Sequence, residues 1–190
     1  HDPAENAFLA SISITAAVGV LMSLATRRFR RELLPRDGFL LVTLIWTVLP
    51  AFGALPLLLH LPGLSFTDAY FEAMSGMTTT GATVISGLDA LPASINFWRC
   101  LLQWIGGMGI LVLMVAILPL LGVGGTQLFR AETAGPLKDA KLTPRITDTA
   151  IGLWSVYGGI SLACFLAYWA GGMGALDAAM HMFTTMSLGG

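Results

Sequence analysis

A run of threonine and glycine, MTTTGAT at Met77 to Thr83, offers the oxygen atoms best placed for chemistry in this sequence. It follows a short segment at 64–77 that is predicted to be helical, so the negative end of a helix dipole points toward it. Glycine at position 81 permits backbone conformations closed to other residues, and consecutive carbonyl oxygens can then replace the hydration shell of a cation. The predicted ligands are the carbonyls of Thr78, Thr79, Thr80 and Gly81, with the hydroxyls adding ligands or holding the strand. The alternative interpretation is a threonine-rich turn after a buried helix.

Two pairs of polar residues spaced four apart suggest other chemistry. Asp68 and Glu72 would share one helix face as a carboxylate dyad, as a negative outer vestibule that enriches cations, or with Glu72 buried for structural reasons. We prefer the vestibule, because no nucleophile or base accompanies the pair. Asp177 and His181 would supply half of a metal site, but the helix dipole and a place near the outer vestibule explain them better. No enzyme activity is predicted.

The composition indicates that a membrane protein carries these residues. Only 11% of the 190 residues are charged and 55% are hydrophobic, whereas soluble domains carry about 25% charged residues. Nine of the ten basic residues fall in two clusters, 27–36 and 130–145, a pattern that excludes a nucleic-acid partner. Cys100 and Cys164 lie in apolar stretches, where a thiol behaves as a small hydrophobic group rather than a disulfide partner or metal ligand.

Four charge-free stretches are long enough to cross the bilayer, since about 20 helical residues cover a hydrocarbon core of roughly 30 Å. They are predicted at 6–26, 38–67, 100–129 and 149–176. Lys and Arg favour the cytoplasmic side, so the basic clusters place the end of the first span and the start of the second inside. The end of the third span and the start of the fourth are placed inside in the same way. The predicted fold class is an all-α membrane protein.

The segment between the second and third spans begins and ends on the outer side, so it cannot cross the membrane. Its helical part, 64–77, would be about 21 Å long. It would be capped by Ser65 or Thr67, with Asp68 in its positive first turn. Non-helical backbone at membrane depth is tolerated only where it lines a cavity. A pore loop is therefore predicted, in which a re-entrant half-helix returns as an extended filter strand.

The chain also repeats itself at an offset of 109 residues. Pro35 aligns with Pro144, Gly63 with Gly172, Asp68 with Asp177, and Gly81 with Gly190. Both copies start from the same side of the membrane, which makes the repeat parallel. Copy one spans 34–121 and copy two stops at Gly190, before its returning helix. We therefore expect the sequence to be a fragment that also lacks an N-terminal helix.

The spans and the repeat together divide the chain into four segments. They are a peripheral transmembrane helix at 1–31, the first repeat at 32–121, a cytoplasmic linker at 122–142 and the incomplete second repeat at 143–190. Two glycine-rich runs are given structural roles. GGMG at 106–109 lies in mid-span, where small residues let helices approach closely or let a helix bend. GVGG at 122–125 is a weak match to a dinucleotide fingerprint and is predicted to end a helix.

These motifs resemble those of the Trk/Ktr/HKT superfamily of potassium uptake proteins, and most closely its bacterial TrkH branch. The similarity covers essentially the whole chain and rests on FEAMSGMTTTGATV, QWIGGMGILVLMVAILP, QLFRAETAGP and KLTPRITDTA. It implies potassium uptake through a single pore made of four such repeats, with the pseudo-fourfold architecture of potassium channels. Each repeat would supply one filter glycine, here Gly81 and Gly190.

The resemblance implies that the filter strand of the second copy is formed by Ser187, Leu188, Gly189 and Gly190. The family usually has threonine at the position of Leu188, so a hydroxyl is lost there while the carbonyl remains. One glycine per strand implies a short, asymmetric filter. Such a filter would discriminate less between potassium and sodium than four identical TVGYG loops do.

The resemblance further implies a homodimer in the bacterial cytoplasmic membrane, surrounded by lipid, with potassium as the transported ion and no tightly bound cofactor. A cytoplasmic nucleotide-binding regulatory ring, of the RCK type and TrkA-like, would gate it. The candidate contacts for this ring, which otherwise only fix the topology, are Arg130, Lys138, Lys141 and Arg145. The alternative is a potassium/proton or potassium/sodium symporter, which typically uses inverted repeats and a mid-span carboxylate.

Overall fold

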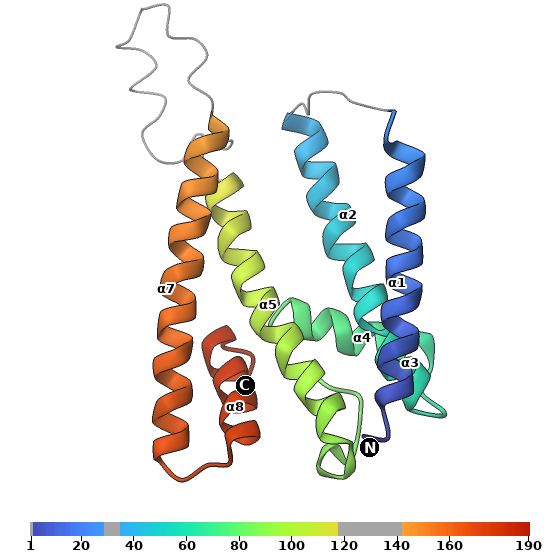
Figure 1. Ribbon diagram of the computed structural model, residues 1–190, viewed down its shortest axis with the longest axis vertical. Coiled ribbons are helices and arrows are strands. Elements are labelled where there is room, and N and C mark those ends of the chain that lie inside the picture. The colour runs from blue at the N-terminus through green and yellow to red at the C-terminus, as the bar shows by residue number, and fades with distance from the viewer. Residues whose placement is uncertain (1, 29–34, 118–141) are drawn as a thin grey trace, which may run out of the picture.

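The computed structural model describes residues 2–28, 35–117 and 142–190, and these residues are mainly helical, with no β-strand among them (Figure 1). The long helices are α1 (Glu5–Thr26), α2 (Pro35–Gly53), α5 (Ala93–Ile117) and α7 (Leu142–Ala170). The short ones are α3 (Leu55–His60), α4 (Phe66–Met77) and α8 (Ala175–Ser187), with a 3-10 turn, η1, at Leu88–Ala90. The predicted all-α fold class is confirmed.

Four segments within the described ranges are long and apolar enough to cross a membrane. They are Glu5–Thr26, Asp37–His60, Ala93–Leu113 and Asp148–Ala170. Large apolar side chains cover their outer surfaces, as at Leu21, which is 66% exposed, and Ile151, which is 60% exposed. Apolar surface of this extent belongs in lipid rather than in water. The chain is therefore a multi-spanning membrane protein.

The second span consists of two helices in series, and it ends earlier than predicted. Pro50 lies inside α2, and Pro56 lies in the first turn of α3, where its missing N–H has no intrahelical partner to lose. The span ends at His60 rather than near Thr67. Gly63, with a φ of +96°, then turns the chain toward α4.

The third span begins at Ala93 and not at Cys100, so the predicted start was wrong. The prediction required a stretch without charges, and Arg99 broke that stretch. In the structure the Arg99 guanidinium forms an ion pair with Glu72 at 2.8 Å. An unpaired arginine at the centre of a span costs about 2.5–3.5 kcal/mol. Pairing lowers this cost and lets the helix start one and a half turns or more before Arg99.

The two half-helices, α4 and α8, lie at the same end of the molecule and flank α5 (Figure 1). They contain 12 and 13 residues, hence about 18 and 20 Å of helix, well short of a hydrocarbon core of roughly 30 Å. α5 packs against α4, α7 and α8, while α2 packs against α4 and α1 against α3. α5 therefore lies between the two half-helices and supports both.

The two half-helices follow the same backbone path at the 109-residue offset. Phe66 begins α4 and Ala175 begins α8. Glycines with matching positive φ precede and follow them: Gly63 at +96° and Gly172 at +97°, Gly81 at +73° and Gly190 at +79°. Positive φ is readily adopted only by glycine, so these pairs mark required backbone turns.

Small and aromatic side chains fill the contacts around α5. Ala69 and Ala73 of α4 are fully buried in a cluster with Leu57, Ile95 and Leu102, which come from α3 and α5. On the other side, Trp104 of α5 contacts the rings of Trp154, Tyr157 and Phe183, which come from α7 and α8. The alanines let α4 approach α5 closely, and the aromatic rings fill the wider gap on the α7 side.

Candidate ion-binding site

Half-helix α4 ends where the predicted filter begins, and local polar contacts fix its start. The hydroxyl of Ser65 accepts a hydrogen bond from the Asp68 amide at 3.1 Å and donates one to the Asp68 carboxylate at 2.8 Å. Of the two predicted caps, Ser65 and Thr67, the helix uses Ser65. Asp68 lies in the first turn, where the positive end of the helix dipole stabilises a carboxylate. The negative end therefore points toward Thr78.

The chain leaves α4 through a Schellman turn. The amide of Thr79 donates to the carbonyl of Gly76 at 2.9 Å, and the amide of Thr80 donates to the carbonyl of Ser75 at 2.9 Å. Thr79 has a left-handed φ of +55°, a conformation that costs an L-residue about 1–2 kcal/mol. The turn satisfies the carbonyls of Ser75 and Gly76 and leaves the carbonyls that follow the helix as candidate ligands for an ion.

The second half-helix ends in the same turn. The Leu188 amide donates to the Thr185 carbonyl at 3.2 Å, and the Gly189 amide donates to the Thr184 carbonyl at 3.1 Å. Leu188 has a φ of +58°, so it occupies the position that Thr79 holds in the first copy. Its side chain is 90% exposed. The leucine therefore replaces threonine at a position fixed by backbone geometry, and its carbonyl is retained.

The filter hydroxyls hold backbone in place, which is one of the two predicted roles. Thr78 Oγ1 donates to the Met74 carbonyl at 2.8 Å and lies 2.8 Å from Thr80 Oγ1. Ser187 Oγ donates to the Thr184 carbonyl at 3.2 Å. With these hydroxyls engaged, the backbone carbonyls remain as the candidate oxygens for a cation.

The two predicted filter segments lie against each other. A Cβ added to Gly81 would overlap the carbonyl oxygen of Gly189 and lie 2.9 Å from its carbonyl carbon. Thr80, Gly81 and Gly190 are exposed, whereas Gly189 is buried. The segments that contain Gly81 and Gly189, more than one hundred residues apart in sequence, thus meet through their backbones. Exposed glycine backbone lies beside this contact.

The GGMG run of α5 makes the close approach that was one of its two predicted roles. A Cβ added to Gly106 would overlap the Met77 carbonyl oxygen, at the end of α4. A Cβ added to Gly107 would lie 3.2 Å from the Ser187 Cβ, at the end of α8. One helix therefore supports the ends of both half-helices through adjacent glycines.

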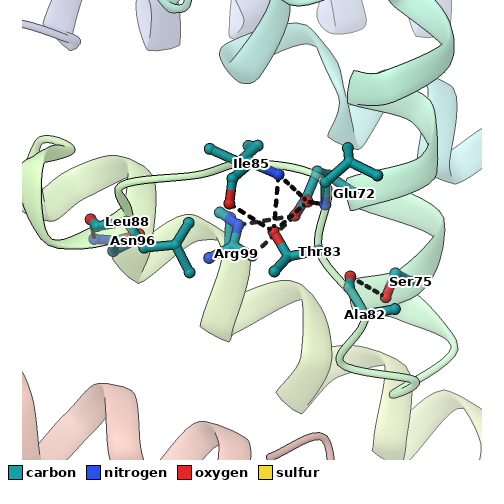
Figure 2. A network of polar contacts seen from close by, with 9 residues as sticks. Glu72, Ser75, Ala82, Thr83, Ile85, Leu88, Asn96 and Arg99 are labelled. Atoms are coloured by element: carbon teal, nitrogen blue, oxygen red, sulfur yellow. Dashed lines mark hydrogen bonds and ion pairs between the residues drawn. The ribbon is translucent and has the colours of Figure 1, made fainter.

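The chain that follows the first filter segment is fastened to α4 and α5 by a polar cluster (Figure 2). Ser75 Oγ donates to the Ala82 carbonyl at 2.7 Å. Glu72 accepts from the Thr83 hydroxyl and from the Val84 amide, the latter at 2.6 Å. Since Glu72 is only 4% exposed and paired with Arg99, its predicted place as a charge of the outer vestibule is wrong. The structural alternative is correct.

Two residues of this region were missed by the sequence reasoning. Arg99 is the only basic residue outside the two clusters, and a lone charge within an apolar stretch signals a buried partner. Gln103, 8% exposed, lies beside the second filter segment, because a Cβ on Gly189 would lie 2.8 Å from its side-chain Cδ. Its Oε1 is buried without a hydrogen-bond partner among the described residues.

The remaining candidates lie away from the filter or outside the described residues. His181 Nδ1 lies 2.9 Å from the Asp177 carbonyl oxygen, and no cluster of three metal-ligating side chains occurs in the described part of the chain. Arg130, Lys138, Lys141, GVGG at 122–125 and most of the predicted linker 122–142 lie outside the described residues, as does the side chain of Arg145.

Spans, half-helices and glycine-mediated contacts define the class: a membrane protein with two re-entrant pore-loop helices. The profile of the TrkH family, described as cation transport protein, matches residues 4–190. The chain belongs to this family.

Named relatives are similar over the whole chain. The Trk system potassium uptake protein TrkH of Halomonas elongata is 56% identical over 185 residues, which cover 97% of this chain and 38% of the relative. The protein of the same name from Escherichia coli K12 is 53% identical, with 100% of this chain and 40% of the relative covered. The chain thus spans 38–40% of the length of these curated relatives.

A solved structure shares the fold. The crystal structure of the potassium transporter TrkH from Vibrio parahaemolyticus matches with a TM-score of 0.84 at 46% identity, and it covers 100% of this chain and 37% of that one. The half-helices and the helices around them therefore follow an architecture that is known from experiment.

Proposed function

We propose that the chain forms two pore loops of a potassium uptake protein in the bacterial cytoplasmic membrane. The single observation that carries this proposal is the meeting of the two half-helix ends at Gly81 and Gly189, beside exposed glycine backbone. The relatives are named potassium uptake proteins, in agreement with it. The activity is passage of an ion and involves no covalent chemistry.

The proposed ligands are backbone carbonyls at the ends of the half-helices. They belong to Thr78, Thr79, Thr80 and Gly81 in the first copy, and to Ser187, Leu188, Gly189 and Gly190 in the second. Each half-helix contributes about half a negative charge at its C-terminal end. Two such ends next to each other favour a cation that has lost its water, without any acidic side chain at the site.

The proposed organisation follows the repeat: a peripheral helix at 1–31, pore-loop repeats at 32–121 and 143–190, and a cytoplasmic linker at 122–142. The proposed partners are a second copy of the protein and a cytoplasmic nucleotide-binding ring. Arg130, Lys138, Lys141 and Arg145 are the proposed contacts of that ring.

Flux through a complete protein tests this function. Residues 1–190 replace the matching segment of Escherichia coli TrkH, and the chimera is purified and reconstituted into liposomes. We expect rubidium to enter down its own gradient, with no proton or sodium gradient present. Entry that requires a proton or sodium gradient would indicate a symporter instead of a pore. A folded chimera that moves no rubidium would overturn the proposal.

A further inference from the structure

Glu72 of α4 is the centre of a buried charged cluster. This cluster lies outside the proposed filter segment 78–81. Its Oε2 accepts hydrogen bonds from Arg99 Nε at 3.0 Å and from Arg99 Nη2 at 2.8 Å. Its Oε1 accepts from the amides of Val84 and Ile85, at 2.6 and 3.3 Å, and from the Thr83 hydroxyl. The Glu72 side chain is 1% exposed and that of Arg99 is 15% exposed. All the bonds converge on one carboxylate (Figure 2).

This carboxylate holds the chain just after the filter. Val84 follows Gly81 by three positions, and Ser75, one turn along α4 from Glu72, holds Ala82 in the same manner. At the other end, the Schellman turn ties Thr80 back to the helix. The segment 78–81 is therefore anchored on both sides, and the outer anchor depends on Glu72 and on the arginine that neutralises it.

The second copy does not place a carboxylate at the position that corresponds to Glu72. At the 109-residue offset the position of Glu72 is occupied by His181, which is exposed. Its Nδ1 lies 2.9 Å from the Asp177 carbonyl oxygen of its own helix, and its ring contacts Tyr168. The two half-helices therefore share a C-terminal turn but differ in the residue at this position.

We propose that Glu72 and Arg99 are a positioning pair that sets the ion selectivity of the first filter segment. Discrimination among alkali ions depends on the number and placement of the coordinating carbonyls. A strand released at Val84 and Ile85 can change the position of the carbonyls at 78–81. This inference rests on the proposed function.

The test compares ion selectivity in folded variants of the chimera described above. Glu72→Gln removes the negative charge and replaces one acceptor oxygen with an amide nitrogen, which donates but cannot accept. Either Arg99 or the Val84 amide then loses its acceptor, and the ion pair is lost. Arg99→Lys keeps the charge and loses the forked donor geometry. Thr83→Val removes the hydroxyl that donates to Glu72 and accepts from the Ile85 amide at 3.1 Å; the position is exposed, and the variant is expected to fold. The control is Asp89→Asn, the same class of change at an exposed acid outside the cluster.

The readouts are the rubidium-to-sodium permeability ratio, together with the KM and maximal rate of rubidium entry. We expect Glu72→Gln to lower the ratio by about tenfold, Arg99→Lys and Thr83→Val by about twofold to fivefold, and Asp89→Asn to leave it unchanged. Glu72→Asp, which keeps the charge, should retain more selectivity than Glu72→Gln.

The outcomes separate this inference from the proposed function. An unsubstituted chimera that moves no rubidium refutes the function. A conducting chimera whose variants keep the original ratio, even with reduced protein yield, assigns the pair to folding alone and overturns the inference. If Glu72→Gln does not fold, an unchanged ratio in both Thr83→Val and Arg99→Lys overturns it equally.

Discussion

Two features of the structure require glycine at position 81: its backbone conformation and its close contact with Gly189. Its φ of +73° lies in the left-handed region, where a side chain costs about 1–2 kcal/mol. A Cβ there would also overlap the Gly189 carbonyl oxygen. The second constraint is the stricter, because Thr79 and Leu188 show that this chain tolerates side chains at positive φ. Substitution at Gly81 must therefore displace backbone in the other filter segment.

We expect Gly81→Ser to lower the rubidium-to-sodium permeability ratio by about tenfold or more, because it moves carbonyls in both segments. Reconstituted chimera and tracer flux measure the effect. Gly87→Ser is the matched control, since Gly87 also has a positive φ, of +71°, but nothing lies within 4 Å of its added Cβ. If Gly87→Ser lowered the ratio as much as Gly81→Ser, backbone strain would explain the effect and the contact with Gly189 would not.

Helix α5 packs closely against both half-helices because it has no side chains at two adjacent positions. Gly106 and Gly107 remove side chains at the height where α4 and α8 end, so the helix backbone touches both ends. Gly109, two residues further along, faces only the ring of Trp46, at 3.6 Å from an added Cβ. The glycines of one run therefore do different things, although the sequence presents them as a single motif.

Gly106→Ala should destabilise the protein and Gly109→Ala should not. The alanine methyl at 106 would overlap the Met77 carbonyl oxygen, and such overpacking costs about 1–3 kcal/mol or more. At 109 the methyl meets ordinary van der Waals distances, and alanine favours the helix by about 1 kcal/mol over glycine. Thermal unfolding in detergent reports both effects. A melting temperature for Gly106→Ala at or above that of Gly109→Ala would contradict the contact.

The limits of sequence reasoning are visible in these elements. Hydropathy located all four spans, and the glycine at 81 marked a required backbone turn, because both signals are local. The start of the third span was missed, since the charge of Arg99 is cancelled by Glu72, 27 residues away. The contact of Gly81 with Gly189 could not be foreseen either, because it depends on how two distant half-helices pack on α5.

At the scale of the whole molecule, one side carries the end of α1, the start of α2, the end of α5 and the start of α7 (Figure 1). The opposite side carries α3, η1 and the starts of both half-helices. Arg27 and Arg28 follow α1 on the first side, and basic residues favour the cytoplasm. We therefore expect both half-helices to enter the membrane from the outside.

Labelling of introduced cysteines in intact cells checks this orientation. In the chimera, Cys100 and Cys164 are replaced by alanine, and Asp89→Cys or Arg28→Cys is added at an exposed position. A membrane-impermeant maleimide should modify position 89 in intact cells and position 28 only after the cells are opened. Labelling of position 28 from outside would reverse the topology.

The adjacency of Met77 and Ser187 to bare helix backbone has a mechanical result. At Gly106 the helix meets the Met77 backbone directly, and at Gly107 it meets the Cα and Cβ of Ser187 with the Tyr157 hydroxyl beside them, so little flexible side chain separates these elements. A tilt or slide of α5 would therefore move the ends of both half-helices together. A displacement of α5 would accordingly be expected to change both loops together.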